Sequence, residues 1–517
     1  MIIAMKNYIK YFIAVTATGV MFSSCKDFLD IKPKGRDLES NYYKNEDQVF
    51  KGLIAAYDVV AWQGGILTNK EGVAMAASDD HYGGGEGAGD GNFVNMDKFT
   101  LTPALGPQED LWSRGYQGIF RANILIEKAP AAEMDAGRKA RIIAEAKTLR
   151  AYFYFDLVRW FKNIPLYTSN ITASEMYNVT QASPEAVYAQ IETDLKEAIA
   201  EPNLPNMVTA ADERGRFSKG TAHALLGKVY LFQEKWTEAA AEFAEVNGST
   251  PGQENPTYGY KLLSDYGKLF TGDPANKFNS ESVLEIFHTT TSGGSWGGGG
   301  VAATEGNIMN IMAGPRGYSP VTAGAPDYYS GWSYWPVTTS LFNAIHFDPR
   351  YKYTIANLDS LKANGIANYT PGAQNTGYFI AKWIARNSNL PTGGGDRDLN
   401  WGQNYYDIRL ADTYLMEAEA IVRGGGNASR AEALIAAVRA RVGLGPVAAT
   451  MDNIKRERRL ELAGEGQRWF DLVRWGDAAA VLGPEGFVAG KNEILPIPLR
   501  EMDNTKIEQS KEWGGTK

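Results

Sequence analysis

Residues 226–251 read LGKVYLFQEKWTEAAAEFAEVNGSTP, and the spacing within this stretch indicates the fold of the 517-residue chain. Its key positions match the pattern of one tetratricopeptide repeat: Leu226, Gly227, Tyr230, Ala239, Phe243 and Pro251. The pattern predicts two helices, between which Gly227 permits close approach and Phe243 fills the remaining gap. Because a single repeat does not bury its own apolar face, neighbouring helices must stack on it.

Helical periodicity elsewhere in the chain supplies those neighbours. From Arg138 to Trp160 apolar residues recur at steps of three and four, which is the spacing of one helical face. Ser183 followed by Pro184 is typical of a helix start, because serine caps free backbone N–H groups and proline suits the first position. The expected helices cover residues 108–128, 138–162, 184–200, 219–234, 407–423 and 428–442. We therefore predict a mainly all-α protein, a solenoid of tetratricopeptide-like helical repeats with a long irregular, loop-rich insertion.

Composition along the chain indicates four parts. Residues 1–24 have the features of a lipoprotein signal peptide, and residues 25–290 hold the N-terminal helical repeats, including the clear unit at 220–253. Residues 291–400 form an irregular insertion rich in aromatic residues and glycine. Residues 401–517 are expected to contribute C-terminal helices that complete the fold.

The signal peptide is predicted from charge and hydrophobicity. Lys6 and Lys10 precede an apolar run at residues 11–22. Two serines stand directly before Cys25, the only cysteine. The run is shorter than the roughly 18 residues that a bilayer span requires, so it is typical of a secretory signal. A lone cysteine at the cleavage site predicts lipidation at Cys25 and attachment to a membrane face. The alternative is an ordinary secretory signal with a cysteine there by chance; either way the chain is exported.

Composition also excludes several classes of function. The chain carries 52 Lys and Arg residues against 60 Asp and Glu residues, a net charge of −8, without a basic block. This balance argues against nucleic acid as a partner and against electrostatic docking to anionic lipid. One cysteine leaves no disulfide to stabilise an exported protein, so a large hydrophobic core must do so.

Three glycine-rich stretches lack the period of either a helix or a strand: residues 79–91, 292–336 and 391–401. Long loops of this kind in a compact protein are usually functional. The second stretch gathers aromatic residues, which favours carbohydrate binding, because flat rings cover the apolar face of a sugar while polar side chains bond its hydroxyl groups. The candidate stacking residues are Trp296, Tyr329, Trp332, Tyr334 and Trp335.

The same stretch offers polar partners for a sugar in Arg316, Asn307 and Asp327. Three of its aromatic residues, however, lie within four positions of one another. In an extended backbone Trp332 and Tyr334 point to one side and Trp335 to the other. At least one of these three side chains is therefore expected to face the protein interior.

Residues that could suggest catalysis or metal binding have plainer explanations. Glu457, Glu461 and Glu465 recur at four-residue spacing in a helix expected from Asp452 to Trp475, but one helical face does not flank a substrate bond from two sides. We interpret the row as ion pairs that tie this helix to the repeats. The histidines stand singly, and the acidic residues of 79–90 fit no calcium-loop template, which favours a solvated loop. We predict no metal site, no cofactor and no enzymatic activity.

Five segments, taken in this order, resemble the SusD/RagB family. They are residues 25–30 (CKDFLD), 145–152 (EAKTLRAY), 408–420 (IRLADTYLMEAEA), 457–475 (ERRLELAGEGQRWFDLVRW) and 495–498 (LPIP) with Gln509. The resemblance implies a lipidated, mostly helical protein of the Bacteroidetes outer membrane without catalytic activity. It also implies a partner, a SusC-like TonB-dependent transporter, to which the protein delivers a glycan or, in some members, a peptide.

The resemblance adds site residues as well. Asp27 and Asp30 resemble the surface-export signal of the family. Binding aromatics in the family also come from the loop ahead of the helix that here contains Trp112, which places His81 and Tyr82 among the candidate ligand-binding residues. Three rival functions remain: uptake of peptides in the same role, a surface hydrolase, and a purely structural scaffold.

Overall fold

The computed structural model describes residues 42–515 except 66, 87–90 and 297–304. The predicted signal peptide and Cys25 lie outside the described residues, so lipidation stays a prediction. Among the helices that are described, none is long and apolar enough to cross a membrane. The described chain begins just before α3 (Glu46–Gly65) and ends just after Trp513.

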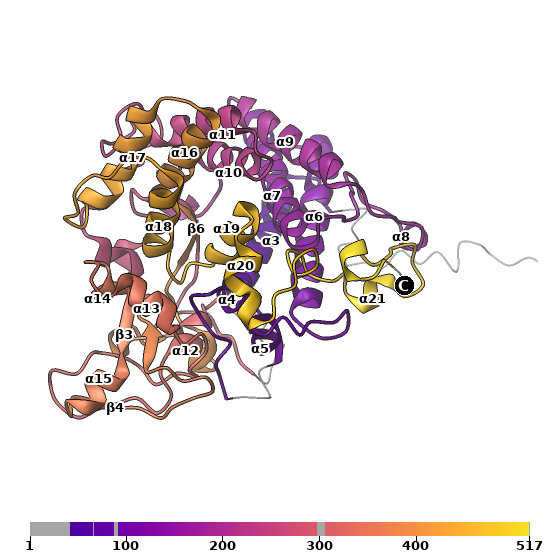
Figure 1. The fold of residues 1–517 in the computed structure, drawn as a ribbon. Helices are drawn as coiled ribbons and strands as arrows, with labels where there is room; N and C mark the ends of the chain where they lie inside the picture. The colour runs from indigo at the N-terminus through magenta and orange to yellow at the C-terminus, as the bar shows by residue number, and fades with distance from the viewer. Residues whose placement is uncertain (1–41, 66, 87–90, 297–304, 516–517) are drawn as a thin grey trace, which may run out of the picture.

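Long helices stack one on the next in chain order, as Figure 1 shows along the upper part of the molecule. α3 packs on α6, α6 on α7, α7 on α9, α9 on α10, α10 on α11, α11 on α16 and α16 on α17. The remaining bounds are α6 (Gln108–Lys128), α7 (Ala136–Phe161), α9 (Pro184–Ala200), α10 (Lys219–Phe232), α11 (Trp236–Asn247), α16 (Leu410–Gly424) and α17 (Ala428–Ala440). This arrangement confirms the predicted helical-repeat architecture.

The α10 and α11 pair has the packing that its sequence predicts. Ala239 and Phe243 are fully buried. A Cβ atom on Gly227 would lie 2.8 Å from the Phe243 ring, so only glycine allows the two helices to approach this closely. The start of α9 is also as expected, because the Ser183 hydroxyl accepts the backbone N–H of Ala186.

An antiparallel pair of strands forms the base of the insertion. β1 (Ser282–Ile286) pairs with β6 (Tyr405–Arg409), so the chain leaves the helical part after β1 and returns to it at β6. Between them the structure contains short helices and two further strand pairs, β2 with β4 and β3 with β5. These elements are α12 (Met309–Ala313), β2 (Ser319–Pro320), α13 (Thr339–Ile345), α14 (Tyr351–Thr354), β3 (Ile355–Asn357), α15 (Leu358–Ala363), β4 (Ala367–Asn368) and β5 (Tyr378–Ile380).

The insertion is therefore less irregular than its composition predicts, especially after residue 337. A small core of its own, separate from the main core, is built from side chains of β3, α15 and β5 among others, including Ala356, Leu358 and Phe379. In Figure 1 the insertion lies below the helical arch. Further helices are shorter. α4 (Lys70–Ala76) and α5 (Gly91–Asp97) precede α6, and α8 (Ala173–Met176) lies between α7 and α9 in the chain. After α17 come α18 (Met451–Glu461), α19 (Arg468–Trp475), α20 (Ala478–Leu482) and α21 (Leu499–Met502).

The single helix expected from Asp452 to Trp475 is wrong, because the structure breaks it into α18 and α19. Gly464 and Gly466 lie between the two helices with φ angles of 75° and 69°. A side chain at Gly464 would clash with Ile380, and one at Gly466 would lie 3.1 Å from the Cα atom of Glu71. Tertiary packing at these two glycines thus ends the helix that periodicity alone predicts.

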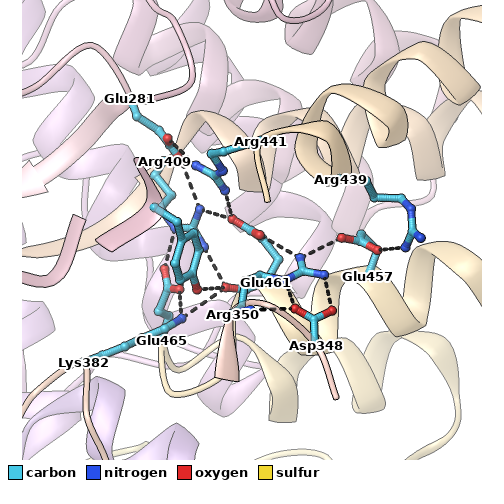
Figure 2. A network of polar contacts seen from close by, with 11 residues as sticks. Glu281, Asp348, Arg350, Lys382, Arg409, Arg439, Arg441, Glu457, Glu461 and Glu465 are labelled. Carbon is cyan, nitrogen blue, oxygen red and sulfur yellow. Dashed lines mark hydrogen bonds and ion pairs between the residues drawn. The ribbon is translucent and has the colours of Figure 1, made fainter. Parts of the chain in front are cut away.

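The row of glutamates binds arginines, which confirms the ion-pair interpretation. Glu461 is completely buried and contacts Arg350 at 2.8 Å, Arg409 at 2.7 Å and Arg441. Figure 2 shows these four residues at the centre of a network that joins α18 to the insertion, to β6 and to α17. The outer members are Glu281, Asp348, Lys382, Arg439, Glu457 and Glu465.

A second buried polar cluster lies at the start of α4. Lys70 Nζ donates to Asp156 at 2.8 Å and to Asp407 at 2.5 Å, so this ammonium group is compensated. Glu71 beside it is only 6% exposed, and burial raises the pKa of its carboxyl group to about 8 although Lys70 acts against the shift. The folded protein thus holds a proton on Glu71 that the unfolded chain releases near pH 4.5.

We expect Glu71→Gln to remove a pH dependence of stability. Since the folded-state pKa is raised from 4.5 to about 8, this group's contribution to stability falls as the pH rises between these two values and is lost above about pH 8. Between pH 6 and pH 9 the free energy of unfolding of the wild type should fall by about 3 kcal/mol more than that of the variant. Urea unfolding at both pH values measures the difference. The exposed Glu432 provides the control, since Glu432→Gln should follow the wild type, and an equal pH response of the Glu71 variant would contradict the assignment.

Candidate functional site

Two of the predicted loops interlock. Residues 79–86 and 333–338 pair through the bridges His81 to Val337 and Gly84 to Tyr334. The Gly85 N–H donates to the Ser333 carbonyl at 2.8 Å. Gly84 has a φ of 71°, and a Cβ atom there would lie 2.5 Å from Pro336. The glycines of the first loop therefore allow close backbone packing against the aromatic loop.

The acidic residues at the start of the first loop are not solvated, which corrects the sequence interpretation. Asp79 pairs with Arg468 at 2.7 Å and with Arg459 at 2.9 Å. Asp80 is 1% exposed and pairs with Arg459 at 2.7 Å. These contacts fix the loop to α18 and α19. Within the described part of the chain, no group of three or more His, Cys, Asp or Glu residues is placed to hold a metal ion.

Trp335 and His81 lie in the core, so the structure contradicts their prediction as ligand contacts. Trp335 is fully buried, with its ring 5.2 Å from that of Phe93 and directly against Gly72 of α4. His81 is 1% exposed, its Nδ1 lies 3.2 Å from the Trp335 carbonyl, and burial lowers the pKa of its ring. The expectation that at least one aromatic of the cluster faces the interior is confirmed by Trp335. Asn307 is also buried, where its amide donates to the Gln403 carbonyl.

Trp296 and Trp332 come together on the surface although they are 36 positions apart in the chain. Their ring centroids are 6.1 Å apart, and the ring planes are inclined by 36°. The Trp296 side chain is 44% exposed. Trp332 is half-buried, and its backbone N–H donates to the Ile311 carbonyl of α12 at 2.9 Å. Trp332 is thus packed against the main core, and Trp296 is the more exposed ring of the pair.

Tyr329 adds a third ring, which connects to the tryptophan pair through the segment 396–397. It is half-buried and packs 5.1 Å from the ring of Trp401, which is only 2% exposed and forms its base. Its hydroxyl accepts a hydrogen bond from Arg397 at 3.3 Å. We refer to Trp296, Tyr329 and Trp332 together as the aromatic face.

The other predicted residues lie at different places. Tyr334 is half-buried and packs 5.4 Å from the ring of Phe93. Tyr82 is half-buried with Lys98 Nζ 5.5 Å from its ring centroid. Arg316 is 32% exposed and forms an ion pair with Glu86. These residues line the seam between the two interlocked loops, so they stay candidates without joining the aromatic face.

The stretch 391–401 contributes residues that sequence reasoning missed. Asp396 accepts hydrogen bonds from the backbone N–H of Trp296 and from the Ser295 hydroxyl, each at 2.7 Å. These bonds, the Ser295 hydroxyl first, hold the pKa of Asp396 below its usual range. Arg397 follows it and contacts Tyr329. The signal in the sequence is an acidic residue directly after Gly393-Gly394-Gly395, in the third glycine-rich stretch.

This arrangement provides ring surfaces with charged groups at their edge. Aromatic rings that are exposed or half-buried bind apolar faces of a ligand, and Arg397 beside them can donate to ligand oxygens. The glutamates of the α18 row are occupied by buried arginines instead. The arrangement is therefore a candidate binding surface, built on loops that a rigid helical scaffold supports.

The fold and the aromatic face together define a helical-repeat protein with a candidate binding surface built on loops. The chain belongs to the SusD family, which confirms the resemblance seen in its sequence. The family model described as the SusD family matches residues 312–513. A second model, described as starch-binding associating with outer membrane, matches residues 27–231.

Similar proteins have been characterised by structure and by sequence. A solved structure named laminarin binding SusD-like protein is 51% identical, with a TM-score of 0.87, over 90% of this chain and 99% of that chain. The surface glycan-binding protein A from Bacteroides thetaiotaomicron was solved in complex with laminarihexaose. It is 25% identical, with a TM-score of 0.78, over 90% of this chain and 98% of that chain. SusD-like protein P38 from Formosa agariphila is 26% identical over 98% of this chain and 99% of its own length.

Proposed function

We propose that the chain binds a glycan through the aromatic face and does not cleave it. The observation that carries the proposal is the pair of Trp296 and Trp332 rings, brought together at 6.1 Å from separate loops. Each ring covers the C–H face of one sugar, and burial of these apolar surfaces provides the binding energy. Arg397, beside Tyr329, supplies a donor for the hydroxyl groups of the sugar.

The ligand class that we propose is a β-1,3-linked glucan such as laminarin. The laminarin-binding relative at 51% identity and the laminarihexaose complex at 25% identity support this choice. The geometry supports it as well, because the two tryptophan planes are inclined by 36°. Inclined platforms suit a curved β-1,3 chain, whose successive sugar faces turn, better than a flat β-1,4 ribbon.

The proposed setting is the outer face of the outer membrane. Lipidation at Cys25 would hold the protein there, and its captured glycan would pass to a SusC-like TonB-dependent transporter. Membership of the SusD family supports this role, as does the description of the second family model as associating with outer membrane. In such a role the protein concentrates the nutrient at the transporter through several weak contacts.

Calorimetric titration of residues 26–517 with hexasaccharides tests the ligand class. We expect laminarihexaose to bind, and cellohexaose and maltohexaose to bind at least roughly tenfold more weakly, because their linkages present the sugar faces at other angles. A peptide digest should release no heat of binding. Equal affinity for all three glucans would contradict the ligand class, and binding of peptides alone would favour peptide uptake over glycan capture.

A further inference from the structure

We propose that Asp396 is a positioning residue that sets the Trp296 ring against Trp332. The inference rests on the proposed function for its ligand but concerns a contact that is already formed without one. Asp396 Oδ2 accepts two hydrogen bonds, one from the backbone N–H of Trp296 and one from the Ser295 hydroxyl, each at 2.7 Å. A carboxylate that accepts two such bonds fixes the backbone directly beneath the indole ring.

Trp296 needs this support because its ring stands at the surface. Its side chain is 44% exposed, whereas the neighbouring Trp332 is half-buried and packs against the main core. The two rings form one platform only if their relative orientation is maintained before the ligand arrives. Otherwise the ligand must order the loop, and that ordering reduces the affinity.

Backbone hydrogen bonds join the segment that contains Asp396 to the segment that contains Trp296. The Asp396 N–H donates to the Gly294 carbonyl at 2.8 Å, and the Gly393 N–H donates to the Thr290 carbonyl at 2.9 Å. A Cβ atom on Gly393 would lie 2.6 Å from the carbonyl carbon of Thr291, so glycine allows the two loops to lie this close. The segments 290–296 and 392–396 are therefore joined through their main chains.

Asn400 completes the junction from the buried side. It is 1% exposed, its amide donates to the Gly294 carbonyl at 2.9 Å and to the Asp396 carbonyl at 2.6 Å, and its Oδ1 accepts the Gly294 N–H at 3.0 Å. One buried amide thus holds both loops in register. The Asp396 side chain then makes the last contact, at the exposed end next to Trp296.

The neighbouring residue connects the same segment to the third ring. Arg397 donates to the Tyr329 hydroxyl, and its guanidinium carbon lies 5.8 Å from the Tyr329 ring centroid. Consecutive side chains of one loop therefore contact Trp296 and Tyr329, which belong to two other loops. This explains how residues distant in sequence form one face, and it assigns a role to the third glycine-rich stretch.

A double-mutant cycle on glycan affinity tests the inference. Asp396→Ala should weaken binding of laminarihexaose about tenfold, and Trp296→Ala should weaken it at least as much. If Asp396 acts through Trp296, the double variant should bind no more weakly than Trp296→Ala alone. Asp396→Asn, which keeps one acceptor oxygen, should bind with intermediate affinity. Additive losses, or wild-type affinity of Asp396→Ala, would overturn the proposal.

Asp398 offers a matched control, because it carries the same charge in the same loop and accepts no hydrogen bond from the part of the chain that the structure describes. Asp398→Ala should leave the affinity unchanged. A general effect of loop charge would lower it as much as Asp396→Ala does, and that result would also overturn the proposal. The single Asp396 and Asp398 variants should keep the wild-type unfolding midpoint, since neither side chain belongs to the core.

A second readout needs no glycan and so separates this inference from the proposed function. In protein labelled with 5-fluorotryptophan, the ¹⁹F signal of Trp296 is the one absent from Trp296→Phe. We expect that signal to shift and broaden in Asp396→Ala and to stay unchanged in Asp398→Ala. An unchanged Trp296 signal in Asp396→Ala would overturn the positioning role, whereas failure of the wild type to bind any glycan would overturn only the proposed function.

Discussion

Replacement of Glu461 by glutamine is expected to lower the free energy of unfolding by about 3 to 5 kcal/mol. The carboxylate is completely buried and contacts three guanidinium groups, those of Arg350, Arg409 and Arg441. A neutral amide of the same size keeps the volume but removes the negative charge on which these arginines depend. Because domains are stable by only about 5 to 15 kcal/mol, this change removes a large share of the total.

The pH dependence of stability provides an independent check on the same network. Burial acts to raise the pKa of Glu461, but Arg441, Arg409 and Arg350 together hold it well below its usual range. Since the folded-state pKa is lowered, the carboxylate stabilises the protein above about pH 4.5, and that stabilisation is lost as the pH falls further. The variant should therefore lose less stability than the wild type between pH 5 and pH 3.

Urea unfolding of the variant, the wild type and Glu432→Gln measures both effects. Glu432 is exposed on α17, so its replacement should change stability by less than about 0.5 kcal/mol. A loss below about 1 kcal/mol in Glu461→Gln would contradict the central place of this carboxylate in the network.

Replacement of both Trp296 and Trp332 by alanine is expected to reduce affinity for laminarihexaose by more than about 100-fold, and Trp332→Ala alone by roughly 10- to 100-fold. Each ring supplies one stacking platform, and the two are adjacent at 6.1 Å, so removal of either leaves a sugar without its apolar contact. Trp332→Tyr keeps a ring in place and should retain most of the affinity. Calorimetric titration measures all of these values.

Trp236 provides the control for these variants. It is also half-buried against the main core, beside Arg423, but it belongs to α11 in the helical arch. Trp236→Ala should bind laminarihexaose like the wild type. Equal losses in the Trp236 and Trp332 variants would show a general effect on folding and would remove the argument for the aromatic face.

The helical part was predictable because its signals are local. The helix expected at residues 108–128 is α6 residue for residue, and the cap at Ser183 is formed as expected. The close approach of α10 and α11 at Gly227 also follows from a short pattern. The break between α18 and α19 was not predictable in this way. It depends on contacts of Gly464 and Gly466 with Ile380 and Glu71, which are distant in the sequence.

The candidate site shows the same division between local and distant signals. Aromatic and glycine-rich composition picks out the loops that carry these rings, but it does not separate the half-buried Trp332 from Trp335 in the core. That difference depends on positive φ angles at Ser333 and Trp335. Serine and tryptophan rarely adopt a positive φ, so the sequence does not predict this backbone conformation. Asp396 was missed because its partners lie about 100 positions away, on a loop that only the folded chain brings alongside.

A structure of the chain in complex with laminarihexaose would test the central claim most directly. We predict successive sugar rings stacked on Trp296 and Trp332, with carbon atoms within about 4 Å of each indole, and Tyr329 at the edge of the same chain. A hexasaccharide bound elsewhere, with both tryptophan rings free of it, would contradict the account.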